Sequence, residues 1–377
     1  MSAFNTCYGL RSITMNGVES IGANAFYGCS ALRTITIPDS VKTIGSGAFA
    51  NCQNLKSITI PDSVTSIGSH AFLKCQYLES ITLGKGMTTI SEGMFSGCTR
   101  LASITIPDNI TTISSKAFEN CTSLKNIVIP NSVTTIASEA FTSCTNLTDI
   151  TIPSSVKTIS SKVFNGCTQL ANVTISDGVT SIEDSAFYNC TSLKTLVIPD
   201  SVTTMASGAL AGCSALKTLT IPFVGGEADA TEASEVTLFG YIFGTNSYTG
   251  GAARIQYYTT GNLYVSTSDR ATYYIPTALK TVIVTGGDLF CGAFCNCSNI
   301  ESITLLKGGT INIPRAAFYN CSSLTALTIH GTAIAPINDS ATHFSFDECS
   351  ALTTLIMPNV TTIGEIVKCC GLKFEPA

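Results

Sequence analysis

A cysteine recurs at a strict interval of 23 residues along the first part of the chain. A phenylalanine precedes these cysteines by three residues in nearly every repeat, and a leucine follows each by three. The cysteines in question are Cys29, Cys52, Cys75, Cys98, Cys121, Cys144, Cys167, Cys190 and Cys213. Such an interval is typical of a solenoid, because one repeat cannot bury its own apolar residues and only stacked repeats can. The interval therefore limits the fold more than any other feature of the chain.

Each repeat divides into two short extended pieces joined by turns. In the repeat that begins at Cys121, Ile127 and Ile129 occupy alternate positions, which predicts a short strand with both side chains inward. Pro130 then ends the strand, because proline cannot donate to a ladder. The V-x-x-I piece predicts a second short strand, and the A-F pair fills the interior. Stacked repeats would form a parallel sheet with strands about 4.8 Å apart.

The repeat resembles that of the BspA-like leucine-rich repeat family, also described as the Treponema pallidum type. The segment SVTSIGSHAFLKCQYLESITL, residues 63–83, matches the family's unit nearly letter for letter. The resemblance implies a leucine-rich repeat solenoid, a curved right-handed superhelix of about 23-residue coils with a parallel β-sheet on its concave face. It also implies a surface or secreted protein of a host-associated microbe, since several members are linked to adhesion.

The repeat lapses after Pro222 and resumes near Leu279, less regularly. We therefore predict three segments: regular repeats over 1–222, an insertion over 223–274, and irregular repeats with a cap over 275–377. The insertion is rich in glycine and tyrosine. Insertions in solenoids map to loops on one face, which is often the binding face.

The insertion's tyrosines are the first candidate binding residues, because exposed tyrosine beside glycine and serine is common on recognition surfaces. The alternative is that these rings form a small core that packs the insertion onto the stack. The candidates are Tyr241, Tyr248, Tyr257, Tyr258 and Tyr264.

The outward positions of the first strands form a second candidate surface, which we call the Thr/Ser lane. It comprises Thr34, Thr36, Ser57, Thr59, Ser80, Thr82, Ser103 and Thr105. The lane is an uncharged surface on which an extended partner could dock, and its binding candidates are Thr34, Thr36, Thr59, Thr82 and Thr105. The alternative is that threonine is present only because it favours strands on a solvated face.

The chain has 17 cysteines, and we predict that the repeat cysteines form a ladder of buried thiols. Stacked side chains would hold neighbouring Cβ atoms farther apart than a disulfide prefers. Four further cysteines, Cys291, Cys295, Cys369 and Cys370, leave a local disulfide or free thiols open. They lack the second ligand pair of a zinc site, so no metal is expected.

No catalytic signature accompanies the repeats. Phosphate loops, nucleophile elbows and paired carboxylates are missing from the sequence, so we expect no enzyme and no cofactor. The 20 basic residues do not cluster, which argues against nucleic acid as a partner. No apolar run reaches the length of about 18 to 20 residues needed for a membrane span.

The function we expect is non-enzymatic binding by a monomeric, adhesin-like protein at the cell surface or outside the cell. Its partner would be a host matrix or surface protein, or a glycan. The alternative is a structural stalk whose repeats present another domain. The first residues, MSAFNTCYGL, show no signal peptide and begin inside a repeat, so we expect a fragment of a longer protein.

Overall fold

The computed structural model describes residues 3–258, 269–331, 333–334 and 345–358. The chain divides into two compact units. Unit 1 comprises Met1–Val179 with Ala186–Thr191, and unit 2 comprises Thr180–Ser185 with Ser192–Ala377. Within each unit the chain forms stacked coils, as the repeat interval predicted.

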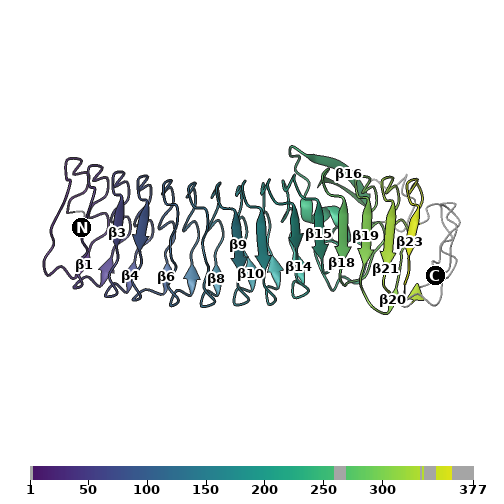
Figure 1. The fold of residues 1–377 in the computed structure, drawn as a ribbon, viewed down its shortest axis with the longest axis horizontal. Helices are drawn as coiled ribbons and strands as arrows, with labels where there is room; N and C mark the ends of the chain where they lie inside the picture. The colour runs from purple at the N-terminus through teal and green to yellow at the C-terminus, as the bar shows by residue number, and fades with distance from the viewer. Residues whose placement is uncertain (1–2, 259–268, 332, 335–344, 359–377) are drawn as a thin grey trace. The chain divides into compact units, whose positions relative to one another are not determined.

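The first strand lane contains the short strands that follow the repeat leucine (Figure 1). In unit 1 the isoleucines of these strands are buried, and the residues between them face out. Its strands in unit 1 are β3 (Ser57–Thr59), β5 (Ser80–Thr82), β9 (Asp149–Ile152) and β11 (Asn172–Ile175). Its strands in unit 2 are β13 (Thr195–Val197), β15 (Thr218–Ile221), β18 (Thr281–Val284), β19 (Ser302–Leu305), β21 (Ala326–Ile329) and β23 (Thr354–Ile356). The strands that pair within the lane, among the described residues, are parallel, and the six strands of unit 2 form one sheet in this order.

The second strand lane contains the two-residue strands of the V-x-x-I pieces. In unit 1 these are β1 (Ser20–Ile21), β2 (Thr43–Ile44), β4 (Ser66–Ile67), β6 (Thr89–Ile90), β7 (Thr112–Ile113), β8 (Thr135–Ile136) and β10 (Thr158–Ile159). In unit 2 they are β12 (Ser181–Ile182), β14 (Thr204–Met205), β20 (Thr310–Ile311) and β22 (Ala333–Ile334). Residues 23 apart pair in register, as Thr43 does with Ser66, so the sequence interval is also the register of the sheet. The predicted fold class is confirmed.

The repeat phenylalanines form one continuous stack inside unit 1, from Phe4 to Phe187. Neighbouring rings are nearly parallel, at 4–21°, with centroids 5.3–5.8 Å apart. From Phe49 to Phe187 the rings are wholly buried. Burying one such side chain stabilises a fold by roughly 1.5–3 kcal/mol, so each coil adds a comparable increment.

The repeat cysteine links each coil to the preceding one. The thiol of Cys75 donates to the carbonyl oxygen of Phe49 at 3.1 Å, and the backbone N–H of Cys52 donates to the same oxygen within its own coil at 3.1 Å. The same thiol-to-phenylalanine bond recurs through unit 1, at 3.0–3.3 Å. A small buried side chain with one weak donor suits this position. The predicted ladder of buried thiols therefore also forms hydrogen bonds between neighbouring coils.

The turns at the corner of each coil require left-handed backbone. The residue before the repeat cysteine has a positive φ, for example 59° at Asn51 and 57° at Asn120. Asparagine and glycine tolerate this region best, which explains why they recur at this position.

In unit 2 the insertion occupies the position that the A-F pair fills in a regular coil. It contains two short 3-10 helices, η1 (Glu235–Thr237) and η2 (Phe239–Phe243), and a hairpin of β16 (Gly251–Tyr257) with β17 (Arg270–Pro276). The N–H of Leu210 donates to Ile242 O at 2.9 Å, and the N–H of Phe239 donates to Ala293 O at 2.9 Å. These bonds match those that join one A-F corner to the next elsewhere, as from Phe49 to Ala71.

Phe239 also continues the aromatic stack. Its ring centroid lies 5.0 Å from that of Phe294, which stacks on Phe318 at 5.6 Å. Meanwhile β15 pairs directly with β18, so the sheet itself is not interrupted. The insertion is therefore built into the core on its η2 side. The boundaries predicted at 222 and 274 remain a prediction.

A buried glutamine completes the join. Gln256 on β16 is fully buried; its Oε1 accepts the N–H of Gly240 at 2.6 Å, and its Nε2 donates to Cys295 O at 2.9 Å. One side chain thus satisfies backbone groups of η2 and of the following coil, which would otherwise be buried without partners. In Figure 1, β16 lies across the upper ends of the strands of unit 2.

Replacing Gly240 with alanine tests whether η2 is part of the core. The added Cβ would lie 2.5 Å from Tyr273 Cβ and 2.6 Å from Gln256 Oε1, so Gly240→Ala should destabilise unit 2 by about 1–3 kcal/mol. Gly308→Ala is the matched control, because nothing lies within 4 Å of its added Cβ. Thermal unfolding followed by circular dichroism measures both. Equal melting temperatures for the two variants would contradict the role given to η2.

Candidate binding surface

The structure separates the tyrosine candidates into two groups. Tyr241 and Tyr248 are half-buried, and burial raises the pKa of both phenols. The hydroxyl of Tyr248 donates to Tyr274 O at 2.6 Å, which ties the start of β16 to β17. Tyr257 and Tyr258 are also half-buried, at the far end of β16, and Tyr264 lies outside the described residues. For Tyr248, packing within the insertion therefore describes the side chain better than binding.

The insertion has the small core that was the alternative interpretation of its aromatic residues. Leu238, Phe239, Ile242 and Phe243 are fully buried, and Tyr273 is 2% exposed. Tyr273 was not a binding candidate, and its position on β17, two residues before the buried Ile275, is the sequence signal for its burial.

The five threonine candidates are all exposed. Thr59 and Thr82 pair in register on β3 and β5, and Thr34, Thr36 and Thr105 face outward from other coils of unit 1. A shallow depression at the edge of the lane is lined by Thr59, Thr82 and the turn residues between Pro61 and Ser63. Unit 1 thus brings the predicted Thr/Ser lane together as one surface.

Beyond Thr105 the first outward position of the strands is no longer serine or threonine. The sequence analysis did not use this change. The outward residues become Asn126, Asp149 and Asn172, and Asn172 Nδ2 donates to Asp149 Oδ1 at 2.6 Å. The hydroxyl of Thr148 donates to Asp149 Oδ2 at 2.5 Å. Hydrogen bonds from Thr148 and Asn172 hold the pKa of Asp149 below its ordinary value, so its carboxylate is a fixed acceptor.

Val128 is 80% exposed on the same part of the lane. A depression surrounds it, and its lining includes Thr105, Asp108, Asn126 and Asn131. The sequence signal for this place is the replacement of the usual threonine by valine.

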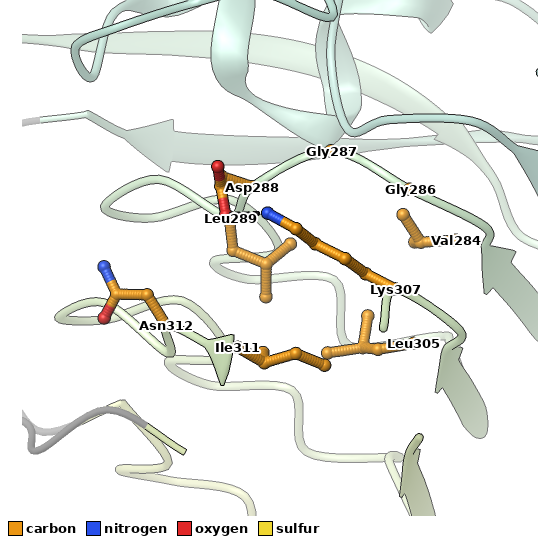
Figure 2. Close-up of a pocket in the computed structure, with 9 residues that line it drawn as sticks. All are labelled: Val284, Gly286, Gly287, Asp288, Leu289, Leu305, Lys307, Ile311 and Asn312. Carbon is orange, nitrogen blue, oxygen red and sulfur yellow. Dashed lines mark hydrogen bonds and ion pairs between the residues drawn. The ribbon is translucent and has the colours of Figure 1, made fainter. Parts of the chain in front are cut away.

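A crevice in unit 2 is too small to hold a ligand. Figure 2 shows Asp288, Lys307 and Ile311 around it, with side chains from the loops after β18 and β19. Lys307 forms an ion pair with Asp288 beside the crevice. It has room for no more than about one water molecule, so its chemistry is structural.

The buried repeat thiols of unit 1 are poorly ionised and therefore weak nucleophiles. Burial raises the pKa of Cys98 and of Cys167 to about 12, and raises those of Cys75 and Cys121 well above the ordinary value. Cys291 and Cys295 are buried, while Cys369 and Cys370 lie outside the described residues. Among the residues that the structure describes, no group of three or more potential ligands could hold a metal ion.

Comparisons with known proteins agree with this architecture. A family model described as BspA type Leucine rich repeat region (6 copies) matches residues 1–125, 111–225 and 289–373. The chain belongs to the BspA-type leucine-rich repeat family. In the described part of this family member, no helix is long and apolar enough to cross a membrane.

Solved structures similar to this BspA-type chain include a leucine-rich repeat protein from Bacteroides ovatus. It is 25% identical with a TM-score of 0.55, over 86% of this chain and 74% of that one. A leucine rich cell surface protein from Faecalibacterium prausnitzii is 24% identical with a TM-score of 0.43, over 94% and 91%. The T. pallidum leucine rich repeat protein is 28% identical with a TM-score of 0.35, over 48% and 77%. None of the curated proteins matches the chain.

Alkylation tests the burial of the thiol ladder. At about pH 8, iodoacetamide should modify the exposed Cys7 in the native chain but leave Cys98 and Cys121 unmodified, because their thiolates are disfavoured and covered. Peptide mass spectrometry before and after unfolding in guanidinium measures the modification. Labelling of native Cys98 at the rate seen for Cys7 would contradict the buried ladder.

Proposed function

We propose that this BspA-type chain is a non-enzymatic, adhesin-like binding protein of a cell surface or the extracellular space. Its binding face is the Thr/Ser lane of unit 1, and its partner is a protein or a glycan. The observation that carries the proposal is the exposure of Thr34, Thr36, Thr59, Thr82 and Thr105 on successive coils.

The chemistry of the lane favours binding over catalysis. Its hydroxyls offer both donors and acceptors, but no titratable pair lies among the five threonines. The carboxylates at its edge, such as Asp39 and Asp62, occur once in each turn, where aspartate is favoured for turn geometry. A repetitive surface without an acid and base pair suits recognition of an extended partner.

The family supports the location and the role. The resemblance carries an expectation of surface or secreted proteins, several of them linked to adhesion, and membership extends that expectation to this chain. Between the two candidate surfaces, the lane is favoured because Tyr248 is committed to contacts inside the insertion.

Two pairs of charge substitutions test which face binds. Thr59→Lys with Thr82→Lys places two lysines on the first strand lane, whereas Thr43→Lys with Ser66→Lys places two on the second lane. On a panel of immobilised matrix proteins and glycans, the first pair should weaken binding at least tenfold, because a tight contact cannot admit two long charged side chains. The second pair should bind like the native chain.

Two further outcomes distinguish the alternatives. If only Tyr257→Ser with Tyr258→Ser removes binding, while the melting temperature is unchanged, the insertion is the binding face and the lane is not. If the native chain binds nothing on the panel, the binding proposal fails and the stalk function takes its place.

A further inference from the structure

One coil of unit 1 departs from the pattern of the lane. The second outward position of the first strands is threonine in the coils on both sides, as at Thr82, Thr105, Thr151 and Thr174, but it is Val128 in this one. Val128 is 80% exposed, more than any other large apolar side chain among the described residues. Valine favours strands, so its exposure alone requires no partner, and the case for one rests on what surrounds Val128.

The strand ladder is also open at this coil. Between β5 and β9 the first lane has only single bridges, from Ser103 to Asn126 and from Asn126 to Asp149. The depression around Val128 occupies this opening.

Ser132, in the lining of the same depression, has lost the bond made by its equivalents. Ser63 Oγ donates to Val41 O at 2.8 Å and Ser155 Oγ donates to Val133 O at 2.6 Å, each bonding to the preceding coil. Ser132 Oγ is buried and has no hydrogen-bond partner in the part of the chain that the structure describes. An unpaired buried hydroxyl destabilises a fold unless water or a ligand pairs with it.

Polar side chains continue from the depression at Asn126 onto the two following coils. Asn126 and Asn172 present amide donors and acceptors, and Asp149 is held as an acceptor by two internal hydrogen bonds. Asp108 and Asn131 stand at the opposite edge of the depression. Donors and acceptors therefore lie near a single exposed apolar side chain, within the depression at Asp108, Asn126 and Asn131 and on the next coil at Asp149.

We propose that this depression, centred on Val128, binds a segment of a neutral glycan. Sugar hydroxyls donate and accept at once, which matches a mixed set of amides and carboxylates, and the C–H face of a sugar ring packs on Val128. Asp108 lines the depression and Asp149 lies on the next coil, so their carboxylates would repel an acidic polysaccharide. The inference rests on the proposed function, because it names a ligand class for the coils of unit 1 that continue the Thr/Ser lane.

The test exchanges the unusual residues for those of neighbouring coils. Asn126→Ser with Val128→Thr restores the residues of the Ser103–Thr105 coil at exposed positions, so the fold should be kept. Thr43→Val with Ser66→Asn is the matched control, since it places the same side chains at exposed positions of the second strand lane. The probes are dextran, mannan and a β-1,3-glucan, with heparin and a Lys-Val alternating peptide for comparison. Affinity electrophoresis measures the polysaccharides, and fluorescence anisotropy measures the peptide.

The native chain and the second-lane control should bind at least one neutral polysaccharide, and the Asn126→Ser/Val128→Thr variant should bind it at least tenfold more weakly. Binding that survives in this variant would overturn the site but leave the lane's binding function standing. Retention of heparin or the cationic peptide alone would overturn the ligand class. If no polysaccharide is retained, the glycan inference fails, and the separate panel of matrix proteins then decides the proposed function.

Discussion

The whole architecture depends on how one coil recognises the next. The carbonyl of each repeat phenylalanine accepts a backbone N–H from its own coil and a cysteine thiol from the following coil, as Phe49 O does. The phenylalanine ring itself stacks on its neighbours at 5.3–5.8 Å. Because both contacts join adjacent coils only, stability spreads along each unit from neighbour to neighbour. The outward side chains are then free to vary, which is why the Thr/Ser lane can carry function.

The same requirement explains the insertion. A gap in the stack would expose the apolar corners of the coils on both sides of it. The insertion therefore has to place an apolar corner of its own in the core. Phe239 and the backbone of η2 do this, and Gln256 satisfies the polar groups left at the join. Replacing the whole insertion with a flexible loop would therefore damage the stack as well as remove the tyrosines. Point substitutions are the sharper test of binding.

Much of the fold could be predicted because the 23-residue interval dictates both burial and register. The inward isoleucines, the strand ends at proline and the buried cysteines all follow from it. The place of η2 could not be predicted, because Phe239 lies outside the interval and only its partner Ala293 reveals its role. The tyrosines looked alike in sequence, yet Tyr248 is tied to Tyr274 by a hydrogen bond that depends on how the hairpin folds. The inward Ile127 and Ile129 imply that Val128 faces outward, but the depression beside it depends on a local opening of the ladder.

Hydrogen exchange of a Phe118→Ala variant tests the central claim most directly. Removing this buried ring breaks the stack in the middle of unit 1, so amides should exchange faster in the coils of Phe95 and Phe141 as well as in its own. Amides near Phe49 should keep their protection, and the exposed substitution Thr105→Ala in the same coil should change nothing. Faster exchange confined to the altered coil, or none at all, would contradict the claim that the phenylalanine and cysteine contacts join each coil to the next.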